Sequence, residues 1–218
     1  MGKELIPCGS ARDLGIILDS NLTYNEHVSK ISASCFSILS QISKVKHIFD
    51  RKLLTTTINS LVFSKLYYCS SVWSNTTETN LSKLQLVQNF AARIVCDKRK
   101  YDHITPILSE LKWLRVKDYL YYRDAILTYK CMNGLTPSYL STKFIERKIQ
   151  KKYNTRSQFE LYPPKCRTET GKRSFLQRGC NIWNNLKPDI RESSCIAFFK
   201  HSLLGDLKRQ DTNFLLQN

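Results

Sequence analysis

The sequence predicts a mainly α-helical protein: a helical bundle preceded by a short N-terminal strand or hairpin, with a basic irregular segment before the last two helices. Apolar residues recur at steps of three and four over long stretches between residues 24 and 133, which is the spacing of a buried helix face. An apolar run bounded by Gly and Asp at residues 13–19 is typical of a strand, or of half a hairpin. Positive charge is concentrated in residues 143–178, where Pro163, Pro164 and Gly171 interrupt the helical pattern.

Three long helices are expected in the first half of the chain. The first covers about residues 24–49, with an apolar stripe that includes Val28, Cys35 and Ile42. The second runs from the capping residue Asp50 to about residue 73, because Asp accepts a hydrogen bond from a free N–H at a helix start. The third covers about residues 78–96. Short connections between such helices favour an antiparallel bundle.

Shorter helices are expected in the second half. Thr105 followed by Pro106 predicts a helix start, and a helix over about 116–133 should end at Gly134. Two further helices are predicted over about 174–186 and 194–209, the last of them capped by Ser194. We therefore divide the chain into a strand or hairpin (1–20), a helical bundle (21–142), a basic irregular segment (143–178), and C-terminal helices with a polar tail (179–218).

The charge balance indicates an anionic partner. Lys and Arg total 34 against 18 Asp and Glu, which gives a net charge of +16. Nucleic acid is the first expectation for such a balance and a membrane surface the second. The charge is uneven, because residues 1–109 carry 13 basic and 8 acidic groups whereas residues 110–218 carry 21 and 10.

Residues 143–178 hold eleven Lys and Arg but only three acidic residues, and aromatic side chains lie among the cations. Cations neutralise phosphates, and aromatic faces stack on unpaired bases. The alternative is a solvated loop whose aromatic residues pack on the bundle. The predicted nucleic-acid-binding residues are Lys148, Lys151, Lys152, Arg156, Lys165, Arg167, Lys172, Arg173 and Arg178. The run Lys98–Lys100 is better explained by favourable charge at a helix C-terminus.

The sequence shows no catalytic constellation, metal-ligand cluster or cofactor site, and only a Cys/His dyad between residues distant in the chain stays open. It has no adjacent acidic pair for two-metal chemistry, no Gly-x-Ser-x-Gly and no glycine-rich phosphate loop. The eight cysteines are never closer than 14 residues, which argues against a zinc site and favours mostly buried thiols. No apolar run reaches the roughly 18 residues of a membrane span, and no secretory core is present. We expect an intracellular protein without a small-molecule substrate.

Several segments resemble the C-terminal region of non-LTR (LINE-type, jockey-like) retrotransposon reverse transcriptases. The first is Asp-Leu-Gly-Ile-Ile-Leu-Asp at 13–19, followed by Leu-Thr-Tyr at 22–24 and His-Val at 27–28. Their order and spacing carry the likeness, which spans about residues 11–209. The other segments that carry it are 66–73, 81–93, 111–114 with Arg123, 129–134, 137–140, 155–157, 173–175, 183–186 and 198–200.

The resemblance implies a thumb-like region that follows the polymerase palm and grips RNA template and primer. The family's paired palm aspartates would lie before Met1, so no catalytic residue carries over and this chain is expected to be inactive alone, although the intact polymerase would use magnesium. RNA or an RNA–DNA duplex is the expected partner, and an intact reverse transcriptase acting in trans is a further candidate. The competing hypothesis is a non-catalytic interaction domain, or a relic reading frame, that binds no nucleic acid usefully.

Overall fold

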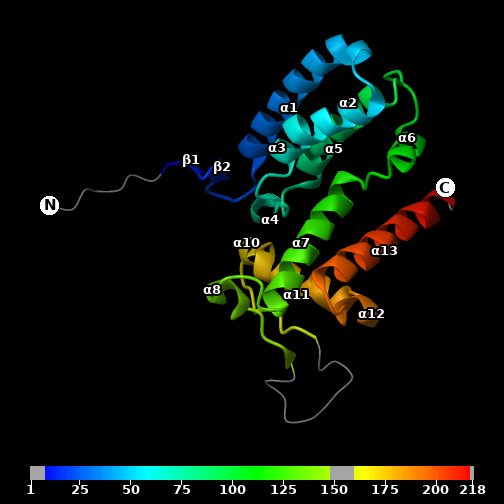
Figure 1. Ribbon diagram of the computed structural model, residues 1–218. Helices are drawn as coiled ribbons and strands as arrows, with labels where there is room; N and C mark the ends of the chain where they lie inside the picture. The colour runs from blue at the N-terminus through cyan, green and yellow to red at the C-terminus, as the bar shows by residue number, and fades with distance from the viewer. Residues whose placement is uncertain (1–7, 148–159, 217–218) are drawn as a thin grey trace. The chain divides into compact units, whose positions relative to one another are not determined.

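The computed structural model describes residues 8–147 and 160–216, with side chains as far as Arg209. The chain is mainly helical after a two-stranded N-terminal sheet, which confirms the predicted fold class (Figure 1). It forms two compact units, residues 1–116 and 117–218. The helical bundle predicted over residues 21–142 extends across the boundary between these units, because hydrophobic periodicity alone does not show which helices pack together.

The N-terminal element is a tight antiparallel hairpin. β1 (Ser10–Asp13) pairs with β2 (Ile16–Asp19), with Asp13 opposite Ile16. Leu14 and Gly15 form the turn, at φ 43° and 89°, and positive φ at both positions is characteristic of a type I′ turn. The run predicted as one strand over 13–19 is therefore divided by this turn, and Asp13 belongs to the first strand.

The first unit is built around two helices that run in the same direction. These are α1 (Asn25–Val45), extended by the 3₁₀ turn η1 (Lys46–Ile48), and α5 (Glu78–Val95). Their contacts advance together along both helices, from Ser29–Lys83 to Phe36–Phe90 and then to Lys46–Asp97. Two helices with one opposing segment between them form an up-down-up bundle, as the predicted antiparallel connections require.

The opposing segment is less regular than predicted. It consists of α2 (Arg51–Ile58), the π-helical η2 (Asn59–Phe63), α3 (Ser64–Leu66) and α4 (Ser70–Trp73). Asp50 caps it as expected, its carboxylate accepting from Leu53 N at 2.6 Å. The single helix predicted to residue 73 is interrupted before α4, where Cys69 has a φ of 45°. Trp73 is nevertheless fully buried.

A small cluster closes the end of the first unit. α6 (Ile104–Leu111) starts after His103, two residues before the predicted Thr105–Pro106 start, and ends at Lys112 with a φ of 57°. Its residues Ile107 and Leu108 pack with Ala92 of α5, and Trp113 packs against the cluster.

The second unit has a stacked aromatic centre. Its elements are α7 (Val116–Met132), α8 (Ser138–Ser141), α10 (Glu169–Lys172), α11 (Phe175–Asn185), α12 (Pro188–Arg191) and α13 (Ile196–Leu216). The Tyr129 ring lies 4.3 Å from Phe199 and 6.5 Å from Trp183, centroid to centroid. The Tyr129 hydroxyl donates to Ser193 O at 2.8 Å. α7 ends before Gly134 as predicted, whereas α13 starts after Cys195 and continues past residue 209.

The cysteines are less buried than expected. Cys35, Cys131 and Cys180 are buried, but Cys8, Cys69 and Cys195 are exposed. Burial raises the pKa of the Cys35 thiol to about 11. Across residues 8–147 and 160–216, no helix has the length and apolar character needed to cross a membrane.

Candidate nucleic-acid interface

The predicted basic segment, residues 143–178, belongs to the second unit. Its described parts are a backbone bridge, a stretch over 162–167 without regular secondary structure, the single turn of α10 and the first turn of α11. The described part before Phe175 is irregular as expected, whereas residues 175–178, predicted as part of the irregular segment, are helical. Lys148, Lys151, Lys152 and Arg156 lie outside the described residues.

The two flanks of residues 148–159 are joined by backbone hydrogen bonds. Arg147 N donates to Glu160 O at 2.8 Å, and Tyr162 N donates to Ile145 O at 2.8 Å. The side chains of Arg147 and Glu160 also form an ion pair at 2.9 Å. The chain therefore enters and leaves this twelve-residue stretch at neighbouring, fixed points.

This junction is anchored to α11. Leu161 is fully buried, and the side chain of Asn184 holds its backbone on both sides: Leu161 N donates to Asn184 Oδ1 at 2.7 Å, and Asn184 Nδ2 donates to Leu161 O at 3.0 Å. Buried backbone groups need such partners, so Asn184 makes burial of this extended residue possible. Sequence reasoning missed Asn184, since its pairing is visible only in three dimensions.

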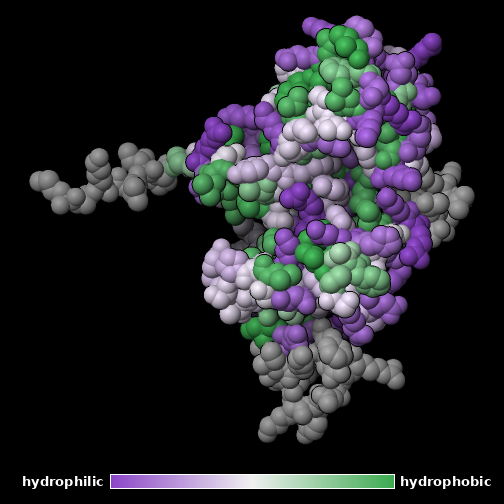
Figure 2. Space-filling model, viewed as in Figure 1, coloured by the Kyte–Doolittle hydropathy of each residue, from purple (hydrophilic) through white to green (hydrophobic). Residues whose placement is uncertain are grey.

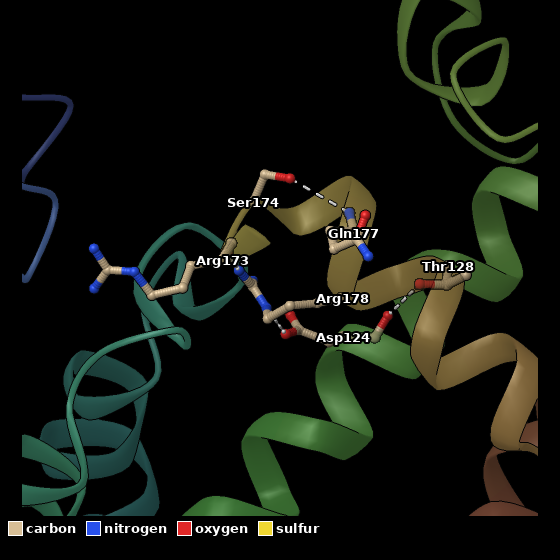
Figure 3. Close-up of polar contacts among 6 residues, drawn as sticks. All are labelled: Asp124, Thr128, Arg173, Ser174, Gln177 and Arg178. Carbon is tan, nitrogen blue, oxygen red and sulfur yellow. Dashed lines mark hydrogen bonds and ion pairs between the residues drawn. The ribbon is translucent and has the colours of Figure 1, made fainter. Parts of the chain in front are cut away.

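Three of the described candidate cations are exposed. Lys165 and Arg167 lie on the irregular stretch after the junction. Lys172 is also exposed and pairs with Glu169 at 2.6 Å, three residues earlier in α10. Such an exposed pair contributes little, so a phosphate can compete for this ammonium group. Arg173 is partly exposed, and its side chain points away from the Asp124–Arg178 pair (Figure 3).

Arg178 lies in a different environment from the other candidates. Its Nε lies 3.2 Å from Asp124 Oδ2, with side-chain exposures of 18% and 4%, and its Nη1 donates to Arg173 O. Figure 3 shows the pair between α11 and α7, with Ser174 capping α11 through Gln177 N. A buried charge that loses its partner is strongly destabilising, so the structure assigns Arg178 to holding α11 on α7.

The aromatic residues of the segment also include both buried and exposed side chains. Phe144 is buried and packs edge-on against Phe175, with centroids 5.9 Å apart, as the packing alternative expects. Tyr162 is 43% exposed beside the junction and remains a candidate for base stacking.

Among the described residues, no group of three or more His, Cys, Asp or Glu side chains lies close enough together to hold a metal ion. His27, the buried histidine, accepts a hydrogen bond at Nδ1 from Ile17 N at 3.3 Å, and burial lowers its pKa. Its surroundings are those of a neutral core side chain.

Comparison of the chain with protein-family models, with curated proteins and with solved structures finds no match.

Proposed function

We propose that this chain is a nucleic-acid-binding helical module that grips RNA or an RNA–DNA duplex, as the region after the palm does in non-LTR retrotransposon reverse transcriptases, without supplying catalytic groups of its own. The observation that carries the proposal is the junction at Ile145–Tyr162. It fixes both flanks of the most basic stretch of the chain on a folded unit.

The charge of that stretch supports a phosphate ligand. Residues 148–159 contain four Lys and Arg and no Asp or Glu. The exposed Lys165, Arg167 and Lys172 follow in the next thirteen residues. Each cation that neutralises a phosphate releases a counterion, which favours binding at low salt.

The junction also holds a described candidate for binding in a fixed position. The buried Leu161 and the double hydrogen bond of Asn184 fix the backbone beside Tyr162. A group that is held in place before binding loses less conformational freedom when a ligand arrives. An unpaired base stacked on the Tyr162 ring would follow the same short stretch of chain as the exposed Lys165 and Arg167.

A protein-interaction role is the second candidate function, and exposed apolar residues favour it. On the first unit, Ile48, Leu53 and Leu61 are 70%, 50% and 52% exposed, and green apolar patches lie among hydrophilic residues in Figure 2. An intact polymerase of the same family is a candidate partner for such a surface.

The two candidates are separated by binding measurements on the whole chain. Fluorescence anisotropy would be recorded with single-stranded RNA, an RNA hairpin and an RNA–DNA duplex over a salt series. The test variant is Lys151→Gln/Lys152→Gln/Arg156→Gln. The control, Arg123→Gln/Lys200→Gln/Arg209→Gln, removes the same charge from exposed residues of the second unit that lie outside 143–178.

The proposal expects binding to weaken with salt, and the test variant to reduce the log–log slope by about 2 on single strands, at about 0.7 per phosphate contact. The control should change the slope much less. Equal slopes for the two variants, or no binding at low salt by a folded chain, would contradict the proposal and favour the protein-interaction role. Polymerase activity of the purified chain would contradict its non-catalytic part.

A further inference from the structure

A cavity of about 440 Å³ lies in the first unit, between α1 and α5. Phe36 of α1 and Phe90, Leu86 and Ile94 of α5 form its apolar wall. The two phenyl rings have centroids 6.1 Å apart and planes inclined by 31°, and both rings are partly exposed. They offer aromatic surface to a ligand at a place where core packing does not use it.

The rim of this cavity is cationic. Lys46, Arg93, Lys98 and Lys100 line it, and no acidic side chain does so among the described residues. Lys46 pairs with Asp97 just outside the lining, and Arg93 donates through Nη2 to Asp102 O at 3.1 Å. Lys98 and Lys100 are both exposed.

The sequence assigned the run Lys98–Lys100 to the dipole of the preceding helix. The fold places two of its members, Lys98 and Lys100, beside Lys46 of η1 and Arg93 of α5. Hydrophobic and charge patterns along the chain did not show this, since residues separated by more than 50 positions meet at the cavity.

We propose that this cavity binds one unpaired nucleotide of a single-stranded nucleic acid. The base lies against the rings of Phe36 and Phe90, and the phosphates on either side of it are neutralised by Lys98 and Lys100. Stacking on aromatic side chains beside cations is the usual way in which proteins hold unpaired bases.

The size and the charge of the cavity favour this ligand over a peptide. A volume of about 440 Å³ is at the small end of ligand pockets, which span about 300–1,000 Å³. A bound amphipathic helix needs a groove long enough for side chains at i, i+3, i+4 and i+7. A rim whose charged side chains are all cationic, around aromatic rings, suits a ligand with a flat apolar part next to negative charge.

The proposal is independent of the basic segment of the second unit. It requires only the first unit, and it adds a second base-stacking site to the one proposed at Tyr162. The two proposals therefore differ in which substitution removes most of the preference for a strand with bases, which is Phe90→Leu for this cavity.

The test compares fluorescein-labelled octauridylate with a labelled eight-residue abasic strand, both titrated with the whole chain. We expect octauridylate to bind at least about fivefold more tightly. Phe90→Leu, which keeps an apolar side chain without an aromatic face, should bring the two dissociation constants within about twofold. Lys98→Gln/Lys100→Gln should weaken binding of both strands. The control Lys52→Gln/Lys83→Gln, on exposed lysines of the same unit, should weaken it less.

Photocrosslinking locates the base directly. Octauridylate carrying one 5-iodouridine should crosslink to the peptide that contains Phe36 or Phe90, as identified by mass spectrometry. Equal affinity for the base-containing and abasic strands, a ratio unchanged by Phe90→Leu, or competition by hexaglutamate as effective as that by unlabelled octauridylate would overturn the proposal. Failure of the basic-segment proposal would instead appear as an unchanged salt slope in the Lys151/Lys152/Arg156 variant, with the base-dependent ratio intact.

Discussion

Gly179 of α11 is the position where adding a single methyl group should be most informative. A Cβ built there would lie 2.8 Å from Thr128 Oγ1 and 2.9 and 3.0 Å from the Phe144 ring atoms Cε1 and Cζ. Carbon atoms do not approach buried neighbours this closely, so Gly179→Ala must displace α7, the Phe144 ring, or α11 itself.

Two opposing contributions determine how much Gly179→Ala changes the free energy of unfolding. Ala in a helix interior is more favourable than Gly by about 1 kcal/mol. Overpacking of a well-packed core costs about 1–3 kcal/mol. The upper part of that range applies, because Thr128 is fully buried and donates to Asp124 O at 2.9 Å, while Phe144 is 7% exposed. The net expectation is a loss of about 1–2 kcal/mol in the free energy of unfolding.

Gly205 of α13 provides the matched control. A Cβ there meets nothing closer than Arg209 Nη2 at 3.9 Å, so Gly205→Ala should stabilise the chain by about 0.5–1 kcal/mol. Urea denaturation followed by far-ultraviolet circular dichroism would compare both variants with the parent chain. If Gly179→Ala stabilised the chain as much as Gly205→Ala, the packing derived for the α7–α11 contact would be refuted.

Three further predictions concern the first unit. Burial lowers the pKa of His27 below 6.5, so the unfolded chain takes up a proton more readily than the folded chain, and the free energy of unfolding should fall as the pH drops below 6.5. The difference between the urea midpoints at pH 7.5 and pH 5.5 should be smaller in His27→Gln than in the parent chain, and an undiminished difference would exclude His27 as the cause. Iodoacetamide at pH 8 should alkylate the exposed Cys69 rapidly. Cys35 is buried and has a pKa of about 11, so it should react only when the chain unfolds, and equal alkylation rates of the two thiols by mass spectrometry would contradict the burial of Cys35. Asp50→Ala removes the cap on Leu53 N and should lower the unfolding free energy by about 1 kcal/mol, measured by urea denaturation against Asp13→Ala in the exposed hairpin; equal losses would argue against the cap.

The ends of helices were predicted well where a capping residue or a glycine acts on the neighbouring turn of the chain. Asp50, Ser174 and Gly134 mark helix boundaries through hydrogen bonds or backbone conformations that depend on neighbouring residues only. The apolar stripe of α1 was likewise predictive, since Val28, Cys35 and Ile42 are all buried.

The irregular course between residues 59 and 69 was not predictable from the apolar spacing of that segment. Leu61 and Cys69 fit the apolar spacing of a continuous helix, yet Leu61 is 52% exposed and Cys69 is exposed. Leu61 lies within the π-helical turn, which accommodates an extra residue. Cys69 lies between α3 and α4 at a positive φ, outside the helix that the pattern assumes.

The distribution of charge along the sequence located the basic segment, but it could not show which of its Lys and Arg side chains are exposed and which form buried ion pairs. Lys165 and Arg167 are exposed as expected, whereas Arg178 is turned by α11 towards Asp124, 54 positions earlier. Whether a cation faces solvent or a buried carboxylate depends on helix packing, which composition does not encode. The cavity at Phe36 and Phe90 escaped sequence reasoning for the same reason.

The double hydrogen bond of Asn184 also has a consequence for self-association. Open strand edges with free N–H and C=O groups are templates on which another chain can add a strand. Asn184 occupies both backbone groups of Leu161 with a side-chain amide, so an incoming strand finds neither group available at that residue. A side chain from α11 therefore takes the place of a third strand at this short edge.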